Sequence, residues 1–185
     1  MNLSVTTTEP PPPASPDSPA RTSAAKARAM VFFAAAALAA IDLGAKAWAQ
    51  QALPGRTISG GLIDLQLAYN PGVAFSLGNA LPSWAVIAVT GLITAAIAVA
   101  AWRISPRANW LQRCGLAAVL GGAVANLTDR TLNGHVTDYL HTGWWPTFNL
   151  ADTCIVVGGF VFALGYLKSG FRQDTGDAPV RESPE

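Results

Sequence analysis

The 185-residue chain is 51% hydrophobic and only 12% charged. Ordinary soluble proteins carry about a quarter charged residues, so this composition excludes a typical small soluble domain and indicates a membrane protein. The formal net charge of +1 provides no basic patch and argues against nucleic acid as a partner. Two cysteines, Cys114 and Cys154, do not make a disulfide framework, and each is expected to pack as a small apolar residue.

The chain starts with a segment rich in Pro, Ser, Thr and Ala, residues 1–28, that is expected to be a disordered cytoplasmic tail. The first apolar segment follows at about Ala29 to Ala49 and is long enough to cross a bilayer. Its "AWA" at 47–49 resembles a signal-peptide cleavage site, but the preceding tail and two charges argue against cleavage. Those charges, Asp42 and Lys46, have the i, i+4 spacing of a structural ion pair.

Residues 50–82 form a loop in which "GLIDLQLAY" alternates like a strand and "NPG" predicts a turn. We expect this loop to form a small extracytoplasmic β-sheet that cradles an extended peptide, with Asp64 solvated on its strand. The next segment, Ser83 to Trp102, is uncharged and predicts a second membrane span.

The third apolar segment, from about Leu111 to Leu132, carries Asn126, Asp129 and Arg130 near its end. An ion pair between Asp129 and its neighbour Arg130 is the expected structural role of this carboxylate. Gly134 can end the helix in a left-handed cap. "VTDYL" then begins an outer segment that must return to the fourth span within a short distance.

The fourth span is expected from Leu150 to Leu167, with Asn149 as its N-cap and Asp152 in its first turn. Residues 169–185 form a second predicted cytoplasmic tail. The predicted fold is therefore an all-α membrane protein of four transmembrane helices, with residues 29–168 as the membrane domain.

The distribution of cations predicts the orientation in the membrane. Nine of the twelve Lys and Arg residues lie in the two tails, at the adjoining Lys168 or between residues 103 and 113, which the positive-inside rule places in the cytoplasm. Loops 50–82 and 132–150 then face outward, and Trp144 and Trp145 suit the headgroup region.

Two aspartates at the outer interface can form a chemical site. The short return between Asp138 and Asp152 keeps these carboxylates near each other. Two carboxylates that share a site hold one proton between them, which suits general acid–base activation of a water. Asp129 is the other possible partner of Asp152, but the adjacent Arg130 should keep it ionised, so Asp138 is the favoured partner and the expected proton holder.

Other chemistries fit the sequence less well. No G-x-S-x-G elbow for serine hydrolysis is present, and His135, Asp138 and His141 on an irregular loop are a weak metal-ligand pattern. A four-span transporter with aspartates as proton carriers would require acids near the bilayer centre and internal repeats. A purely structural membrane protein would leave Asp138 unexplained.

Five blocks, in order along residues 36–168, resemble the lipoprotein signal peptidases, the bacterial signal peptidase II family. "IDLGAK" is similar to D-x-x-x-K, "YNPGVAFS" to N-x-G-x-A-F and "GGAVANLTDR" to G-G-A-x-x-N-x-x-D-R. "GHVTDYL" is similar to G-x-V-x-D-F and "FNLADT" to F-N-x-A-D-S. Tyr139 departs from this pattern, because Phe is usual there.

The resemblance implies an aspartic endopeptidase of the bacterial cytoplasmic (inner) membrane, with its active site at the outer face. Such an enzyme cleaves prolipoproteins just before a cysteine that carries diacylglycerol, and needs neither a metal ion nor another cofactor. Its partners would be diacylglyceryl-modified prolipoproteins and membrane lipid, and a monomer is expected. Asp138 and Asp152 correspond to the catalytic pair. The residues that would line or support the site are Asn70, Gly72, Asn126, Asp129, Arg130, Asn149, Asp42 and Lys46.

Overall fold

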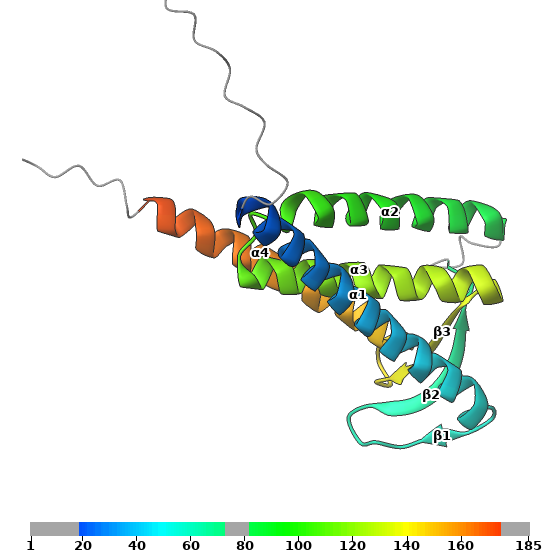
Figure 1. Ribbon diagram of the computed structural model, residues 1–185. Coiled ribbons are helices and arrows are strands. Elements are labelled where there is room, and N and C mark those ends of the chain that lie inside the picture. Colours follow the sequence, from blue (N-terminus) through cyan, green and yellow to red (C-terminus); the bar gives the residue numbers. More distant parts are fainter. Residues whose placement is uncertain (1–18, 73–81, 175–185) are drawn as a thin grey trace, which may run out of the picture.

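The computed structural model describes residues 19–72 and 82–174 (Figure 1). The helices are α1 (Pro19–Ala52), α2 (Ser83–Ile104), α3 (Trp110–Asn133) and α4 (Leu150–Asp174). The strands are β1 (Thr57–Ile58), β2 (Asp64–Asn70) and β3 (Val136–His141), which lie together at one end of the helices. Parts of the predicted tails, 1–18 and 175–185, and the end of the "YNPGVAFS" block lie outside the described residues.

Both terminal helices are longer than expected. The α1 helix starts at Pro19 and not near Ala29, so the expectation of disorder is wrong for residues 19–28. This segment is rich in the helix formers Ala, Lys and Arg. It is also held to α2, because Arg28 Nε donates to the Trp102 carbonyl at 3.1 Å and the guanidinium lies 4.4 Å from the Trp102 ring centre. At the other terminus, α4 continues through the first residues of the predicted tail to Asp174.

Three helices within the described ranges are long and apolar enough to cross a membrane: Ala20–Ala52, Ser83–Ile104 and Leu150–Ser169. The expected third span, α3, is not among them, because it carries Arg113, Asn126, Asp129 and Arg130 along its length. Instead, α3 packs against each of the other three helices (Figure 1). Its polar residues are thereby placed inside the bundle.

The outer faces of α2 and α4 are apolar and exposed. Leu92 is 74% exposed and Phe160 69% exposed, and many other large apolar side chains on these helices are similarly open. An apolar surface of this extent is typical of contact with a membrane or another apolar partner.

Two adjacent glycines allow α3 to approach α1 and α4 closely. A Cβ atom on Gly121 would lie 2.7 Å from the Ala35 carbonyl oxygen of α1. A Cβ atom on Gly122 would clash with the Ala151 carbonyl oxygen of α4. Because Ala151 directly precedes Asp152, the close packing at Gly122 positions the start of α4.

The sheet takes two strands from loop 50–82, where it was predicted, and a third strand from the loop between α3 and α4, which was not predicted. The strand order is β1-β2-β3 and all neighbours are antiparallel. The third strand is "VTDYLH", whose β-branched and aromatic residues favour a strand, and its partner β2 is distant in the sequence. In this register Asp138 lies opposite Ala68, and Val136 lies opposite Asn70.

Candidate active site

Asn149 joins the two aspartates. Its side chain donates to Asp138 Oδ1 at 2.6 Å, and its own Oδ1 accepts from the Asp152 backbone amide at 2.9 Å. The Asn149 amide in turn lies 3.3 Å from Asp152 Oδ2, which completes a reciprocal cap at the start of α4. The predicted N-cap is therefore confirmed, and the same residue contacts Asp138 as well.

The segment between the aspartates folds back on itself. The amides of Tyr139 and Leu140 both donate to the Phe148 carbonyl, at 2.9 and 2.8 Å, and the Phe148 amide donates to Leu140 at 3.0 Å. These bonds place the residue after Asp138 beside the residue before Asn149. The predicted left-handed cap at Gly134 is also present, with φ 76°, so α3 ends where β3 must begin.

Burial raises the pKa of the Asp138 carboxyl to about 6, from its ordinary value of 3.8. The hydrogen bond from Asn149 acts in the opposite direction, as do the Asn70 side chain and the charge of Lys46. The negative charge of Asp152 adds to the increase. Asp138, which is 2% exposed, therefore retains a proton at a higher pH than an ordinary aspartate.

The predicted ion pair of α1 is confirmed and belongs to the same network. Lys46 Nζ lies 2.8 Å from Asp42 Oδ2, and both side chains are 2% exposed. Asp42 Oδ1 accepts from the Ala151 amide at 3.0 Å and from the Tyr139 hydroxyl at 3.3 Å. Asp42 therefore binds a backbone amide at the positive end of α4, next to Asp152.

Asn126 connects this ion pair to Asp152. Lys46 Nζ donates to Asn126 Oδ1 at 2.6 Å, and Asn126 Nδ2 donates to Asp152 Oδ1 at 2.7 Å. The positive charge of Lys46 thus fixes which way the Asn126 amide is turned. The amide then presents a donor, and not an acceptor, to the Asp152 carboxylate.

The expectation that Asp129 pairs with Arg130 is wrong. Asp129 accepts from the Asn133 side chain at 2.7 Å and from the Thr137 amide at 2.6 Å, and Lys46 Nζ lies 3.7 Å away. Adjacent residues on a helix do not face each other, which explains why the neighbouring cation is not the partner. Asp129 holds the start of β3 to the end of α3.

Arg130, Asn70 and Gly72 meet at the other side of the site. Arg130 is 8% exposed, and a Cβ atom on Gly72 would lie 3.1 Å from Arg130 Nε. Gly72 has φ 97°, a conformation that favours glycine, and its amide donates to Asn70 Oδ1 at 2.9 Å. The predicted turn at "NPG" is present and brings the backbone close to the guanidinium.

Sequence reasoning missed three residues of this network: Gln50, Thr137 and Tyr139. Gln50 Nε2 donates to Thr137 Oγ1 at 2.7 Å, and the Tyr139 hydroxyl contacts Asp42 and accepts from the Leu150 amide at 3.2 Å. Thr137 and Tyr139 flank Asp138 on β3, so their side chains lie on the face of the strand opposite to that of Asp138. The alternation in "VTDYL" was the signal that could have identified them.

The three residues of the metal alternative do not converge. The His135 ring lies 4.4 Å from the Tyr69 ring, and His141 Nδ1 lies 3.1 Å from Thr147 Oγ1. Within residues 19–72 and 82–174, no group of three His, Cys, Asp or Glu side chains is placed to hold a metal ion.

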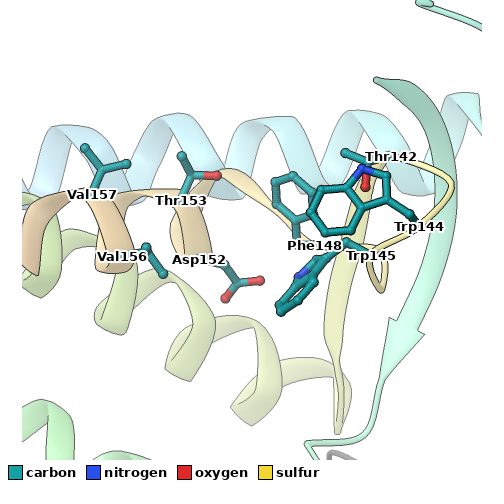
Figure 2. Close-up of a pocket in the computed structure, with 8 residues that line it drawn as sticks. All are labelled: Thr142, Trp144, Trp145, Phe148, Asp152, Thr153, Val156 and Val157. Atoms are coloured by element: carbon teal, nitrogen blue, oxygen red, sulfur yellow. The ribbon is translucent and has the colours of Figure 1, made fainter. Parts of the chain in front are cut away.

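A pocket of about 400 Å³ adjoins one of the aspartates. Figure 2 shows the Asp152 carboxylate in its wall, between the aliphatic side chains of α4 and the aromatic rings of the preceding loop. The lining residues are Thr142, Trp144, Trp145, Phe148, Asp152, Thr153, Val156 and Val157.

The fold and the site define a membrane protein with two linked aspartates at one end of a helix bundle. Residues 34–168 match the family model described as signal peptidase (SPase) II. The chain therefore belongs to the signal peptidase II family, a family of proteases, as the five sequence blocks indicated.

Known relatives agree with this assignment. A lipoprotein signal peptidase of Rhodococcus jostii is 34% identical over 146 residues, which are 74% of this chain and 72% of the relative. One from Syntrophomonas wolfei is 36% identical over 139 residues, 72% of this chain and 90% of the relative. A solved bacterial membrane enzyme shares the fold with a TM-score of 0.66 at 20% identity, over 84% of this chain and 95% of that one.

Proposed function

We propose that this protein is a membrane aspartic endopeptidase that removes signal peptides from diacylglyceryl-modified prolipoproteins. It cleaves just before the lipidated cysteine. The family supplies the reaction, since its curated relatives are lipoprotein signal peptidases. The assignment of the catalytic pair rests on the two contacts of the Asn149 side chain. Its Nδ2 donates to Asp138, and its Oδ1 accepts from the Asp152 amide.

In the proposed mechanism, a water lies between the ionised Asp152 and the protonated Asp138. Asp152 takes a proton from the water while the water oxygen bonds to the scissile carbonyl carbon. Asp138 donates its proton to the carbonyl oxygen. The resulting diol then returns one proton to Asp138 while the C–N bond breaks. The departing nitrogen takes the proton from Asp152, which leaves a carboxyl group on the signal peptide and a free amine on the lipidated cysteine.

The raised pKa of Asp138 supports its role as the proton holder before the reaction. Asn126, oriented by Lys46, supports Asp152, and Asp42 supports the start of α4. Asp129 supports β3 through the Thr137 amide. Two carboxylates and a water are sufficient for this chemistry, so activity requires no metal ion or other cofactor.

Asn70, Gly72 and Arg130 are proposed to line the site where the extended peptide approaches Asp138. The small sheet is proposed to cradle this peptide. Its strand β2 carries Asn70 directly into the turn at Gly72, beside the buried guanidinium.

The proposed topology has four spans, and the third of them, α3, is shielded by α1, α2 and α4. Both termini are cytoplasmic, and the sheet and the aspartates are at the outer face of the bacterial cytoplasmic membrane. The positions of the cations support this orientation: Arg28, Arg113 and Lys168 lie toward the end of the bundle remote from the sheet. The exposed apolar faces contact membrane lipid, and the enzyme acts as a monomer through its domain at residues 29–168.

The test is cleavage of a purified diacylglyceryl-modified prolipoprotein by the purified full chain, with products identified by mass spectrometry. The expected product begins at the lipidated cysteine, and Asp152→Asn should yield none of it. Cleavage at another bond, or an undiminished rate in the Asp152→Asn protein, would contradict the proposal.

A further inference from the structure

A second apolar cavity, of about 400 Å³, lies between α1, α2 and α3, away from the aspartates. Phe32 and Ala35 of α1 form one wall, and Gly91 and Ala98 of α2 form another. Because these two α2 residues are about two helical turns apart, the cavity extends along about 10 Å of the helix. Among the described residues that line it, none is charged. The proposed reaction does not use this cavity.

The cavity opens toward the apolar outer surface of the bundle. The first turns of α1 lie beside the end of α2, and the two helices then diverge toward the sheet (Figure 1). Val124 lines the cavity and is 37% exposed, although its helix, α3, packs against the other three. Thr94, the one polar residue among the described lining residues, donates its hydroxyl to the Thr90 carbonyl at 2.8 Å. The cavity therefore suits an apolar occupant that enters from the membrane.

Arg28 is held at one end of this cavity. The Phe32 ring, which lines the cavity, contacts the edge of the Trp102 ring with centres 6.0 Å apart. Arg28 lies one turn before Phe32 on α1, and its guanidinium lies 4.4 Å from the centre of the same Trp102 ring. Its Nε donates to the Trp102 carbonyl, whereas its terminal nitrogens have no hydrogen-bond partner among the described residues. These remaining N–H donors are available to a ligand.

The charge around Arg28 is positive and is not balanced by a nearby acid. Arg28 forms no ion pair with a described residue, and no residue in 19–41 or 83–128 is acidic. Arg103 directly follows Trp102 and is exposed. Trp102 is itself 53% exposed, and tryptophan is enriched at the depth of the lipid headgroups. The end of the cavity at Arg28 therefore suits an anionic group at headgroup depth.

We propose that this cavity binds one acyl chain of an anionic phospholipid, whose phosphate is held by Arg28. The planar guanidinium matches the geometry of phosphate oxygens and can donate two hydrogen bonds to them. The acyl chain lies along α2 from Ala98 toward Gly91, where α1 leaves α2. In the orientation proposed above, this end of the bundle lies in the cytoplasmic leaflet, whose anionic lipids attract basic residues.

The first test removes the phosphate from the ligand and the guanidinium from the protein. The purified full chain in neutral detergent is titrated with dioleoyl phosphatidylglycerol or with dioleoylglycerol, which has the same chains and no phosphate. Native mass spectrometry measures each Kd. The unmodified protein should bind phosphatidylglycerol at least about tenfold more tightly, the effect of charge-assisted hydrogen bonds. Arg28→Gln should weaken this binding about tenfold and change the Kd of dioleoylglycerol less than about twofold.

Two controls define the residue and the headgroup. Arg107→Gln removes an exposed cation from the loop between α2 and α3, and should change neither Kd more than about twofold. Dioleoyl phosphatidylcholine carries a choline cation beside its phosphate. It should bind the unmodified protein at least about threefold more weakly than phosphatidylglycerol, because like charges repel at this end of the bundle.

The second test fills the cavity. Ala95 and Ala96 are adjacent and exposed on α2, but only Ala95 lines the cavity. Ala95→Phe should weaken the binding of both phosphatidylglycerol and dioleoylglycerol about tenfold, because the ring occupies the space of the acyl chain. Ala96→Phe is the matched control and should change neither Kd more than about twofold. This pair of variants also serves if Arg28→Gln does not fold, as judged by its melting temperature.

Equal affinity of the unmodified protein for phosphatidylglycerol and dioleoylglycerol would overturn the proposal, because Arg28 would then hold no phosphate. Equal effects of Arg28→Gln and Arg107→Gln would also overturn it, as would equal effects of Ala95→Phe and Ala96→Phe. Phosphatidylcholine that binds as tightly as phosphatidylglycerol would overturn the preference for an anionic lipid. Each readout is a binding constant and not a cleavage rate, so the outcome does not depend on the function proposed above.

Discussion

At the scale of single residues, Asn149 combines two tasks that can be separated by substitution. Its oxygen caps α4 by accepting from the Asp152 amide, while its nitrogen donates to Asp138. A serine at this position retains a capping oxygen but lacks the Nδ2 group that donates to Asp138, whereas an alanine provides neither. The pair of variants therefore separates helix stability from the protonation of Asp138.

We expect the kcat/KM of the unmodified enzyme to fall as pH rises through about 6, where Asp138 loses its proton. Because Asn149 lowers the pKa of Asp138, Asn149→Ser should move this fall to higher pH with little loss of melting temperature. Asn149→Ala should move it similarly and also lower stability by about 1 kcal/mol. An unchanged pH profile in both variants would contradict the role of Asn149.

The raised pKa of Asp138 also makes the stability of the folded protein depend on pH. The pKa of Asp138 is higher in the folded protein than its ordinary value of 3.8. The stability that its protonated form contributes is fully present below pH 3.8 and is lost as pH rises through about 6. Asp138→Asn should remove this part of the pH dependence, as measured by unfolding at several pH values.

The hydroxyl of Tyr139, the residue that departs from the G-x-V-x-D-F pattern, contacts both Asp42 and the Leu150 amide. We expect Tyr139→Phe to lower kcat about threefold to tenfold with little change in KM, because α4 and Asp152 lose a positioning contact. Tyr166→Phe, at a 68% exposed site far along α4, is the matched control. A KM change with constant kcat would instead place Tyr139 in substrate binding.

At the scale of elements, the contact between α3 and α4 determines where Asp152 lies. Gly122 of α3 approaches the Ala151 carbonyl so closely that no side chain fits between them. The same carbonyl belongs to the residue before Asp152, and Asn126, one turn further along α3, binds the Asp152 carboxylate. A shift of one helix along the other would therefore disturb packing and the site together.

We expect Gly122→Ala to lower stability by about 1–3 kcal/mol and to reduce activity at least tenfold, because α4 must move away from α3. Gly159→Ala on α4 is the control, since a Cβ atom there would meet nothing within 4 Å. That variant should be neutral or slightly stabilising, because alanine favours a helix over glycine. Thermal unfolding and peptide cleavage measure both effects, and equal behaviour of the two variants would contradict this account of the packing.

Local sequence patterns predicted the contacts between residues that lie three or four positions apart in the chain. The Asp42–Lys46 spacing and the Asn149–Asp152 spacing each specify a pair within one helical turn, and both pairs are present. The partners of Asp129 could not be predicted in this way. They include the Thr137 amide, and the position of Thr137 depends on β3 pairing with the distant strand β2.

At the scale of the whole molecule, Arg28, Arg113 and Lys168 lie toward one end of the helices, and Asp138 and Asp152 lie toward the other. This arrangement predicts the orientation. In a background without Cys114 and Cys154, a cysteine at Ser59 in the sheet region should react with an impermeant reagent in intact cells. A cysteine at Arg107, between α2 and α3, should react only after the membrane is permeabilised. The reverse pattern would place the aspartates in the cytoplasm.

The central claim is that Asp138 and Asp152 together cleave the peptide bond, and that Asp129 acts only through structure. The most direct measurement is the single-turnover rate of Asp138→Asn, Asp152→Asn and Asp129→Asn, each checked for folding by its melting temperature. We predict no detectable cleavage for the first two with a folded protein, and measurable residual cleavage with a lowered melting temperature for the third. Substantial cleavage by folded Asp138→Asn, together with a complete loss in folded Asp129→Asn, would contradict the account.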